Sequence, residues 1–286
     1  MGHPRAQTRP PCVCDIHSNV AAEKSQLVLL GIPFDANSSY LRGAAAAPPL
    51  IREALRCQAS NTWAESGVDV GSSFLDAGDL ILAVDSAFSA IENAVAEVLD
   101  NERAPLCLGG DHSITYPIIR AVAQHFPDLT IVHFDAHPDL YSEFEGNRFS
   151  HACPFACIME EGLAKRLIQL GIRTMNDHQR RQAARFGVEV VEMKDLPALD
   201  RLRLSGPVYI SFDIDALDPG FAPGVSHREP GGMTVREAIS HLHAIQGKIV
   251  GVDLVEYNPA QDIANLTATV CAKLLKEMLG KMIACR

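Results

Sequence analysis

The feature that most constrains the fold of this chain is a regular alternation of short apolar runs with longer stretches of helical periodicity. The apolar runs are rich in Val, Ile and Leu, which is typical of strands buried on both faces. The intervening stretches place apolar residues at the spacing of one helix face. This alternation predicts a parallel sheet covered by helices. The predicted strands are 26–32, 104–110, 129–137, 167–173, 188–193, 207–215 and 248–259, and the predicted helices are 48–57, 86–101, 114–126, 177–187, 234–247 and 266–283.

The length and composition of the chain favour one globular domain. With 286 residues it can bury a sizeable core, and no composition shift or internal repeat marks a boundary. We therefore predict a single domain over residues 25–286, preceded by a flexible leader at 1–24.

Charge and hydropathy argue against two classes of partner. The formal net charge is −10 and no basic tract occurs, which argues against a nucleic-acid surface. No apolar run approaches the roughly 20 residues of a membrane helix, so we expect no membrane partner. The first residues lack the apolar segment of a secretory signal, which predicts a cytoplasmic protein, or one of an organellar matrix if the source is eukaryotic.

Polar clusters follow three of the predicted strands: GGDHS at 109–113, DAHPD at 135–139 and DIDALDP at 213–219. In open α/β sheets, ligands bind outside the carboxyl ends of the strands. Alternate residues of an extended segment face the same side, so each cluster can point its polar side chains into one cavity. Carboxylates that converge in this way repel one another unless cations lie between them. The candidate metal ligands are His112, Asp135, His137, Asp139, Asp213 and Asp215.

The donor set indicates which metal such a cluster would hold. Carboxylates and imidazoles without a thiolate favour Mn²⁺ over a structural Zn²⁺ site. Six side chains exceed the needs of one ion with an open position and suit two ions about 3.5–4 Å apart. Two nearby residues have other expected roles, His133 in the core and Asp111 as a loop or hydrogen-bond residue. A zinc site on His151, Cys153 and Cys157 is the weaker alternative, because no second cysteine pair completes it.

The same clusters resemble a known family. GGDHS, DAHPD and SFDIDALDP are similar to the three signature blocks of the ureohydrolases, the arginase and agmatinase family. The resemblance extends from GIPFD near residue 31 to VEYNP near residue 255. The stretches NSSYLRGAAAAPPLIREAL, FEGNRFSHACPFACIMEEG and FAPGVSHREPGGMT are similar to those of plant-type arginases. The resemblance implies an arginase-like three-layer α/β/α sandwich with a mostly parallel sheet, a binuclear manganese site, and a homotrimer or homohexamer.

The resemblance also implies how the ligands are shared. His112 and Asp139 would bind one ion, His137 and Asp215 the other, and Asp135 and Asp213 would bridge them. In the family, hydroxide formed from water between the two cations attacks the guanidinium carbon. The tetrahedral intermediate then collapses to urea and an amine.

Further site residues follow from the same resemblance. Asp139 is placed among the catalytic residues as well as the ligands, with His151 as the proton shuttle and Glu256 as the carboxylate that binds the guanidinium. His151 and Glu256 count as substrate-binding too. Asn147 lies in the segment that touches the α-carboxylate in arginases. Asn176 occupies the position where animal arginases place a carboxylate for the α-amino group.

The expected function is therefore the hydrolysis of a small cationic guanidino compound, with L-arginine giving L-ornithine and urea as the favoured reaction. Agmatine, or another guanidino compound such as 4-guanidinobutyrate, is the alternative substrate, because Asn176 binds an ammonium less strongly than a carboxylate would. A non-catalytic metal-binding relative is a remote alternative. A nucleotide-binding oxidoreductase is disfavoured, since no G-x-G-x-x-G follows a predicted strand.

Overall fold

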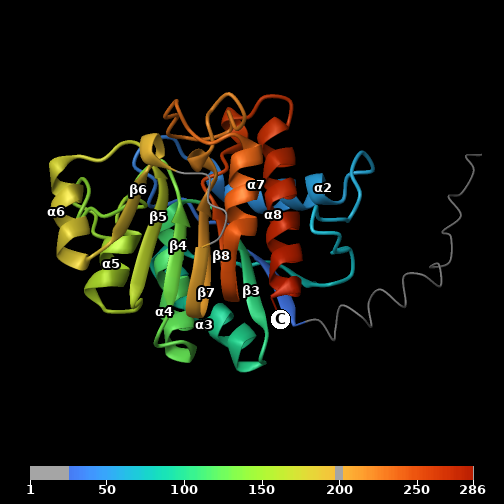
Figure 1. Ribbon diagram of the computed structural model, residues 1–286, viewed down its shortest axis with the longest axis horizontal. Coiled ribbons are helices and arrows are strands. Elements are labelled where there is room, and N and C mark those ends of the chain that lie inside the picture. The colour runs from blue at the N-terminus through green and yellow to red at the C-terminus, as the bar shows by residue number, and fades with distance from the viewer. Residues whose placement is uncertain (1–25, 197–201, 286) are drawn as a thin grey trace, which may run out of the picture.

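The centre of the molecule is one sheet of eight strands, all of them paired in parallel (Figure 1). The computed structural model describes residues 26–196 and 202–285, so the predicted leader at 1–24 lies outside the described residues. In spatial order the strands run β2-β1-β3-β8-β7-β4-β5-β6. Their bounds are β1 Leu27–Gly31, β2 Leu75–Asp79, β3 Ala104–Leu108, β4 Thr130–Phe134, β5 Arg166–Ile172, β6 Glu189–Glu192, β7 Leu202–Asp213 and β8 Ile245–Val255.

Helices cover both faces of the sheet and make three layers, as predicted. Strand residues alternate between two cores: Leu27 and Leu29 pack into one, Val28 and Leu30 into the other. The helices of the first core are α2 Ala47–Leu55, α7 Val235–Ala244 and α8 Leu266–Ala284, of which α7 and α8 lie in front of the sheet in Figure 1. The helices of the second core are α3 Ala87–Asp100, α4 Thr115–His125, α5 Pro154–Glu160 and α6 Asp177–Phe186.

The structure differs from the predicted elements in three places. Strand β2 and helix α5 were not predicted, and the residues of the predicted helix beyond Ala244 belong instead to β8. The predicted helix 114–126 contains Pro117, which is the third residue of α4, where the backbone nitrogen has no carbonyl partner within the helix. In the described ranges, no helix combines the length and apolarity that a membrane span requires.

The strand order determines where a site can form. Strands β3 and β4 are consecutive in the sequence but are separated in the sheet by β8 and β7, which come last in the sequence. The connection from β4 leads outward to β5 and that from β7 leads the other way to β8, and this reversal leaves a crevice at the carboxyl ends of the strands, where ligands bind in open α/β sheets. The four central strands β3, β8, β7 and β4 all end at this edge, because they are parallel.

Candidate active site

The six predicted ligands all follow the carboxyl ends of central strands. His112 lies in a short 3₁₀ turn after β3, residues 135–139 follow β4, and Asp213 and Asp215 lie at the end of β7. Glu256 directly follows β8, the strand between β3 and β7. The six ligands are buried except for His137, which is half-buried. Three loops therefore bring together the six residues of the three sequence clusters, and a fourth loop, after β8, adds Glu256.

The ring of His112 is fixed by hydrogen bonds on its far side. Ser211 Oγ donates to Asp253 Oδ1 at 2.7 Å, so it accepts from Nε2 of His112 at 3.0 Å. The lone pair of His112 is then on Nδ1, which is buried and has no hydrogen-bond partner in the described chain. One oxygen of each of three carboxylates lies within 3.2 Å of this atom, those of Asp135, Asp139 and Asp213. A lone pair that faces three carboxylate oxygens indicates a cation between them.

Asp135 is held by groups on both of its oxygens. The amide nitrogen of Gln169 donates to Pro138 O at 2.6 Å, which fixes the orientation of the amide, and also to Nδ1 of His133 at 3.0 Å. His133 therefore carries its proton on Nε2 and donates it to Asp135 Oδ2 at 2.7 Å. The backbone N–H of His137 donates to Oδ1 at 2.6 Å. His133 is fully buried, in agreement with its predicted core position, but it also orients a predicted ligand.

A second group of ligand atoms lies beside the first. Ligand atoms of Asp135, His137 and Asp215 lie within 4.8 Å of one another, with His137 Nδ1 3.0 Å from Asp215 Oδ2. The other oxygen of Asp215 accepts from the backbone N–H of Ala136 at 3.1 Å. Asp213 Oδ1 accepts from the N–H of Asp215 at 2.8 Å, which leaves its Oδ2 near His112. Asp135 belongs to both groups, as a bridging ligand would.

The electrostatics of the cluster fit divalent cations. Burial raises the pKa of Asp213 well above its usual range, and Asp215 and Asp135 raise it further. Burial also raises the pKa of Asp215, although His137 opposes the shift. Asp135 behaves differently, since its histidine neighbours outweigh burial and lower its pKa well below the usual range. Carboxylates packed this closely are stable as anions only around positive charge, so the residues fit two metal ions.

The backbone is unusual where these loops turn inward. Asp139 and Glu256 have positive φ angles of 48° and 65°, a region that residues other than glycine seldom adopt. Gly110 lies so close to Phe34 that a Cβ would be 1.8 Å from the carbonyl oxygen of that residue. The N–H of Glu256 donates to Gly110 O at 2.8 Å, which joins the loops after β3 and β8.

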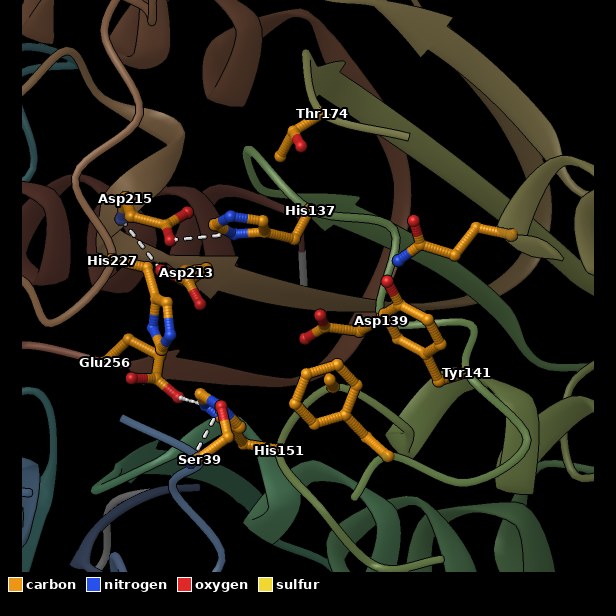
Figure 2. Close-up of a pocket in the computed structure, with 13 residues that line it drawn as sticks. Ser39, His137, Asp139, Tyr141, His151, Thr174, Asp213, Asp215, His227 and Glu256 are labelled. Carbon is orange, nitrogen blue, oxygen red and sulfur yellow. Dashed lines mark hydrogen bonds and ion pairs between the residues drawn. The ribbon is translucent and has the colours of Figure 1, made fainter. Parts of the chain in front are cut away.

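These loops enclose a cavity of about 170 Å³ that ligand and non-ligand side chains line together (Figure 2). Glu256 is buried at its wall, and its Oε1 accepts from the N–H of His112 and from His151 Nδ1, both at 2.8 Å. No described residue donates to its second oxygen, Oε2. The positive charge of His151, followed by hydrogen bonds from His151 and His112, outweighs burial and lowers the pKa of Glu256. An ionised carboxylate with one free oxygen can bind a planar cation.

His151 is held between Glu256 and a serine that the sequence did not single out. The backbone N–H of Ser39 lies 3.2 Å from Nε2 of His151, so this nitrogen accepts and Nδ1 carries the proton that Glu256 receives. Burial lowers the pKa of His151, but the charge and hydrogen bond of Glu256 raise it to about 9. A second proton on Nε2 would have Ser39 Oγ as its acceptor, 2.8 Å away. The ring can thus take up and release a proton beside the cavity.

The two predicted asparagines do not line the cavity. Asn147 donates to Asn37 Oδ1 at 3.1 Å and accepts from the N–H of Phe149. Asn176 caps α6, where it and Gln179 exchange side-chain to backbone hydrogen bonds. Its Nδ2 donates to the hydroxyl of Tyr141 at 2.6 Å. Tyr141 and Gln179 do line the cavity, so Asn176 lies behind two of the wall residues. The substrate contacts of Asn147 and Asn176 remain predictions.

Sequence reasoning missed several wall residues, of which His227 is the most conspicuous. It lies in the loop FAPGVSHREPGGMT, which begins at residue 221, just after the DIDALDP block, and whose only sequence signal is its similarity to plant-type arginases. Burial, and then the nearby His151, lower the pKa of His227, so its ring is neutral at pH 7. Ser39, Tyr141, Phe144, Thr174 and Gln179 are further wall residues that were not among the predicted site residues, although Ser39 and Phe144 lie in the stretches similar to plant-type arginases.

The alternative zinc site is not formed. His151 points toward Glu256, while Cys153 and Cys157 contact backbone carbonyls of Asn147 and Arg148 at 3.8 and 3.6 Å. In the described ranges, the groups that could hold a metal do not include these cysteines. Cys157 is a buried thiol of α5, and Cys153 caps that helix.

Comparison with known proteins gives a consistent set of relatives. The model of the Arginase family matches residues 25–280. The chain is 46% identical over 279 residues to Arginase 1, mitochondrial, of Arabidopsis thaliana, covering 91% of this chain and 82% of that protein. It is 34% identical over 274 residues to Agmatinase of Bacillus cereus, covering 92% and 94%. Among solved structures, Arginase from Medicago truncatula has a TM-score of 0.86 and 41% identity, over 94% of this chain and 92% of that one.

Proposed function

Since the chain belongs to the arginase family, we propose that it hydrolyses L-arginine to L-ornithine and urea at a site with two manganese ions. The observation that carries the proposal is the shared cavity of Figure 2. Glu256, which has one oxygen without a described donor, lines this cavity together with four of the six predicted ligands, His137, Asp139, Asp213 and Asp215. A guanidinium bound by Glu256 would lie next to the ions.

The chain's own residues would act in three ways. His112, Asp135, His137, Asp139, Asp213 and Asp215 would hold two divalent cations, whose chemistry would be to make hydroxide available near neutral pH. Glu256 binds the guanidinium through charge-assisted hydrogen bonds and holds its carbon for attack. Asp139 keeps a carboxylate against the reacting centre, fixed by its backbone conformation. His151, with Nε2 open to a second proton, passes that proton to the departing amine nitrogen, which leaves as the neutral amine of ornithine.

The relatives favour arginine over agmatine as the substrate. The residues of the cavity wall limit how strongly the site can prefer arginine. The plant relative named arginase is 46% identical, whereas the relative named agmatinase is 34% identical. Among the described residues that line the cavity, none is Lys or Arg. The α-carboxylate of arginine would therefore meet neutral donors such as the hydroxyls of Ser39, Tyr141 and Thr174.

The remaining parts of the proposal concern the assembly. We propose Mn²⁺ as the native metal on the mixed carboxylate and imidazole donor set. We propose a single domain over 25–286 and a homotrimer or homohexamer, which light scattering of the purified protein would test. The compartment is proposed to be the cytoplasm or an organelle, because the Arabidopsis relative is named mitochondrial.

The proposal is tested by urea release from arginine with the manganese-loaded protein. Asp135→Asn should lower kcat/KM by more than the 10- to 100-fold that is typical when an outer hydrogen-bond partner of a metal ligand is lost. Arginine, agmatine and 4-guanidinobutyrate are then compared by kcat/KM, which is the measure of discrimination. No urea above the Asp135→Asn background with any of the three would refute the proposed hydrolysis, and a higher value for agmatine would reassign the substrate.

A further inference from the structure

His227 is a cavity residue that has no role in the steps above. It is half-buried and lines the same space as Glu256 and the metal-ligand side chains. Its ring centroid lies 5.9 Å from that of His137 and 5.2 Å from that of His151. The ring thus lies between a predicted metal ligand and the His151–Glu256 pair, at the wall of the space that the proposed guanidinium would occupy (Figure 2).

The loop around His227 is anchored on both sides. Ser226 is buried, donates to Leu41 O at 2.8 Å and accepts from Nδ2 of Asn258 at 3.0 Å. Arg228 donates through Nε to a carbonyl of the same loop at 3.0 Å. Because both neighbours are fixed, the backbone directs the imidazole into the cavity, as a binding residue requires.

Neither ring nitrogen of His227 has a hydrogen-bond partner among the described residues. In the described part of the chain, its contacts are ring contacts with Tyr40, His137 and His151, and no hydrogen bond reaches either nitrogen. A half-buried imidazole usually satisfies at least one nitrogen. The neutral ring has one lone pair and one N–H to offer to a ligand.

We propose that His227 binds the substrate directly, accepting a hydrogen bond from the guanidinium through its unprotonated ring nitrogen. This inference rests on the proposed function. A guanidinium has only N–H donors and no acceptor, so a neutral imidazole can meet it only with its lone pair. The carboxylate of Glu256 can accept two of these N–H groups, which leaves others for His227. A neutral acceptor adds a contact and adds no further negative charge to a cavity already rich in carboxylates.

Two variants separate a hydrogen bond from ring packing. His227→Phe keeps the ring contacts with Tyr40, His137 and His151 but removes both nitrogens. His227→Gln removes the ring and keeps an acceptor oxygen at similar reach. We expect His227→Phe to weaken arginine binding by about 10- to 100-fold, the usual effect of losing a hydrogen bond to a charged group, and His227→Gln to weaken it less. The opposite order, or an unchanged His227→Phe, would overturn the proposal.

Agmatine shows which group of the substrate His227 contacts, because it carries the same guanidinium without the α-carboxylate. Calorimetry with arginine and with agmatine on the manganese-loaded protein should give similar losses for His227→Phe. A loss confined to arginine would show that the ring meets the carboxylate instead, and would overturn the guanidinium contact. His125→Phe is the matched control, because His125 ends α4 away from the cavity.

The experiments distinguish failure of the His227 contact from failure of the proposed reaction. If the wild-type protein binds arginine but releases no urea, the proposed reaction falls while the His227 contact is still measured by calorimetry. If urea is released normally and His227→Phe binds arginine like wild type, the contact falls while the reaction stands. Thermal unfolding of both His227 variants shows whether each one is folded before its affinity is compared.

Discussion

At the residue scale, the site depends on side chains that set the tautomers of its histidines. The convergence of the candidate ligands could be predicted, because alternation along an extended segment is visible in the sequence. The residues behind them could not. Ser211, Gln169 and Asp253 are polar residues within strands, and only the pairing of β5, β7 and β8 with their neighbours shows what each of them contacts.

Gln169→Leu should weaken metal binding without any change to a ligand. The variant removes the donor to His133 Nδ1 and to Pro138 O, which frees His133 to carry its proton on the wrong nitrogen. We expect the affinity for Mn²⁺ to fall by about 10-fold or more, as for other partners of metal ligands. The free energy of unfolding should fall by about 1–3 kcal/mol for the unsatisfied groups. Calorimetric titration with Mn²⁺ and urea unfolding measure the two effects.

Gln182→Leu is the matched control for this prediction. Gln182 is a similarly buried glutamine, but it lies in α6 and its side-chain nitrogen has no hydrogen-bond partner in the described ranges. Its replacement should leave the Mn²⁺ affinity unchanged. Equal affinities for the two variants and the wild type would contradict the assigned role of Gln169.

At the element scale, the sequence pattern missed the elements that are stabilised by contacts with other elements and have no periodicity of their own. Strand β2 has the sequence LDAGD, which carries no apolar alternation, and its pairing with β1 is supported by Arg52 of α2, which bonds Asp76 at 2.9 Å and also contacts Asp79. Helix α5 is only seven residues long, too short for a periodic signal. The strongly periodic elements were predicted to within a few residues.

The caps of α6 and α7 offer a matched pair of substitutions. Both helices begin with a capping box, Asn176 with Gln179 in α6 and Thr234 with Glu237 in α7. Asn176→Ala and Thr234→Ala should each lower the free energy of unfolding by about 1 kcal/mol. Only Asn176→Ala should also raise KM for arginine, because it releases the hydroxyl of Tyr141. Urea unfolding and urea-release kinetics on both variants measure this.

The comparison of the two caps decides what Asn176 does. If Asn176→Ala changes stability but leaves KM at the wild-type value, the residue is a cap and nothing more, and its predicted substrate role is wrong. If both variants raise KM equally, the effect comes from general loosening of the fold.

At the scale of the whole molecule, the site exists only when the sheet is assembled. Its candidate ligands come from three loops, the last of which lies 74 residues beyond Asp139, and they meet because β3, β8, β7 and β4 are neighbours. The alternation in the sequence predicts a parallel sheet but not the order of its strands. That order depends on long-range packing, so the contacts of Ser39, His151 and Glu256 across three loops could not be derived from the chain alone.

Bound metal should reverse the order of stability of the wild type and the variant Asp213→Asn. Without cations, Asp213 destabilises the fold when ionised, because burial and then Asp215 and Asp135 raise its pKa. Asp213→Asn keeps an oxygen that can accept from the N–H of Asp215 and removes the charge. In excess chelator the variant should therefore unfold at a temperature equal to or above that of the wild type. With Mn²⁺ at 100 times its Kd, binding to the folded state adds about 2.7 kcal/mol to the wild type, and the weakened site of the variant gains less.

The decisive result is that the wild type melts at or below the temperature of Asp213→Asn in chelator but above it in Mn²⁺. Each kcal/mol corresponds to roughly 2–4 °C for a chain of this size class, so scanning calorimetry with and without chelator resolves it. Asp128→Asn, an exposed aspartate paired with Lys165, should shift equally under both conditions. If Asp213→Asn were less stable than the wild type by the same amount with and without Mn²⁺, Asp213 would be an ordinary structural carboxylate. The fold would then hold its acidic centre together without metal, and repulsion among the four aspartates could not be the reason that this edge of the sheet binds cations.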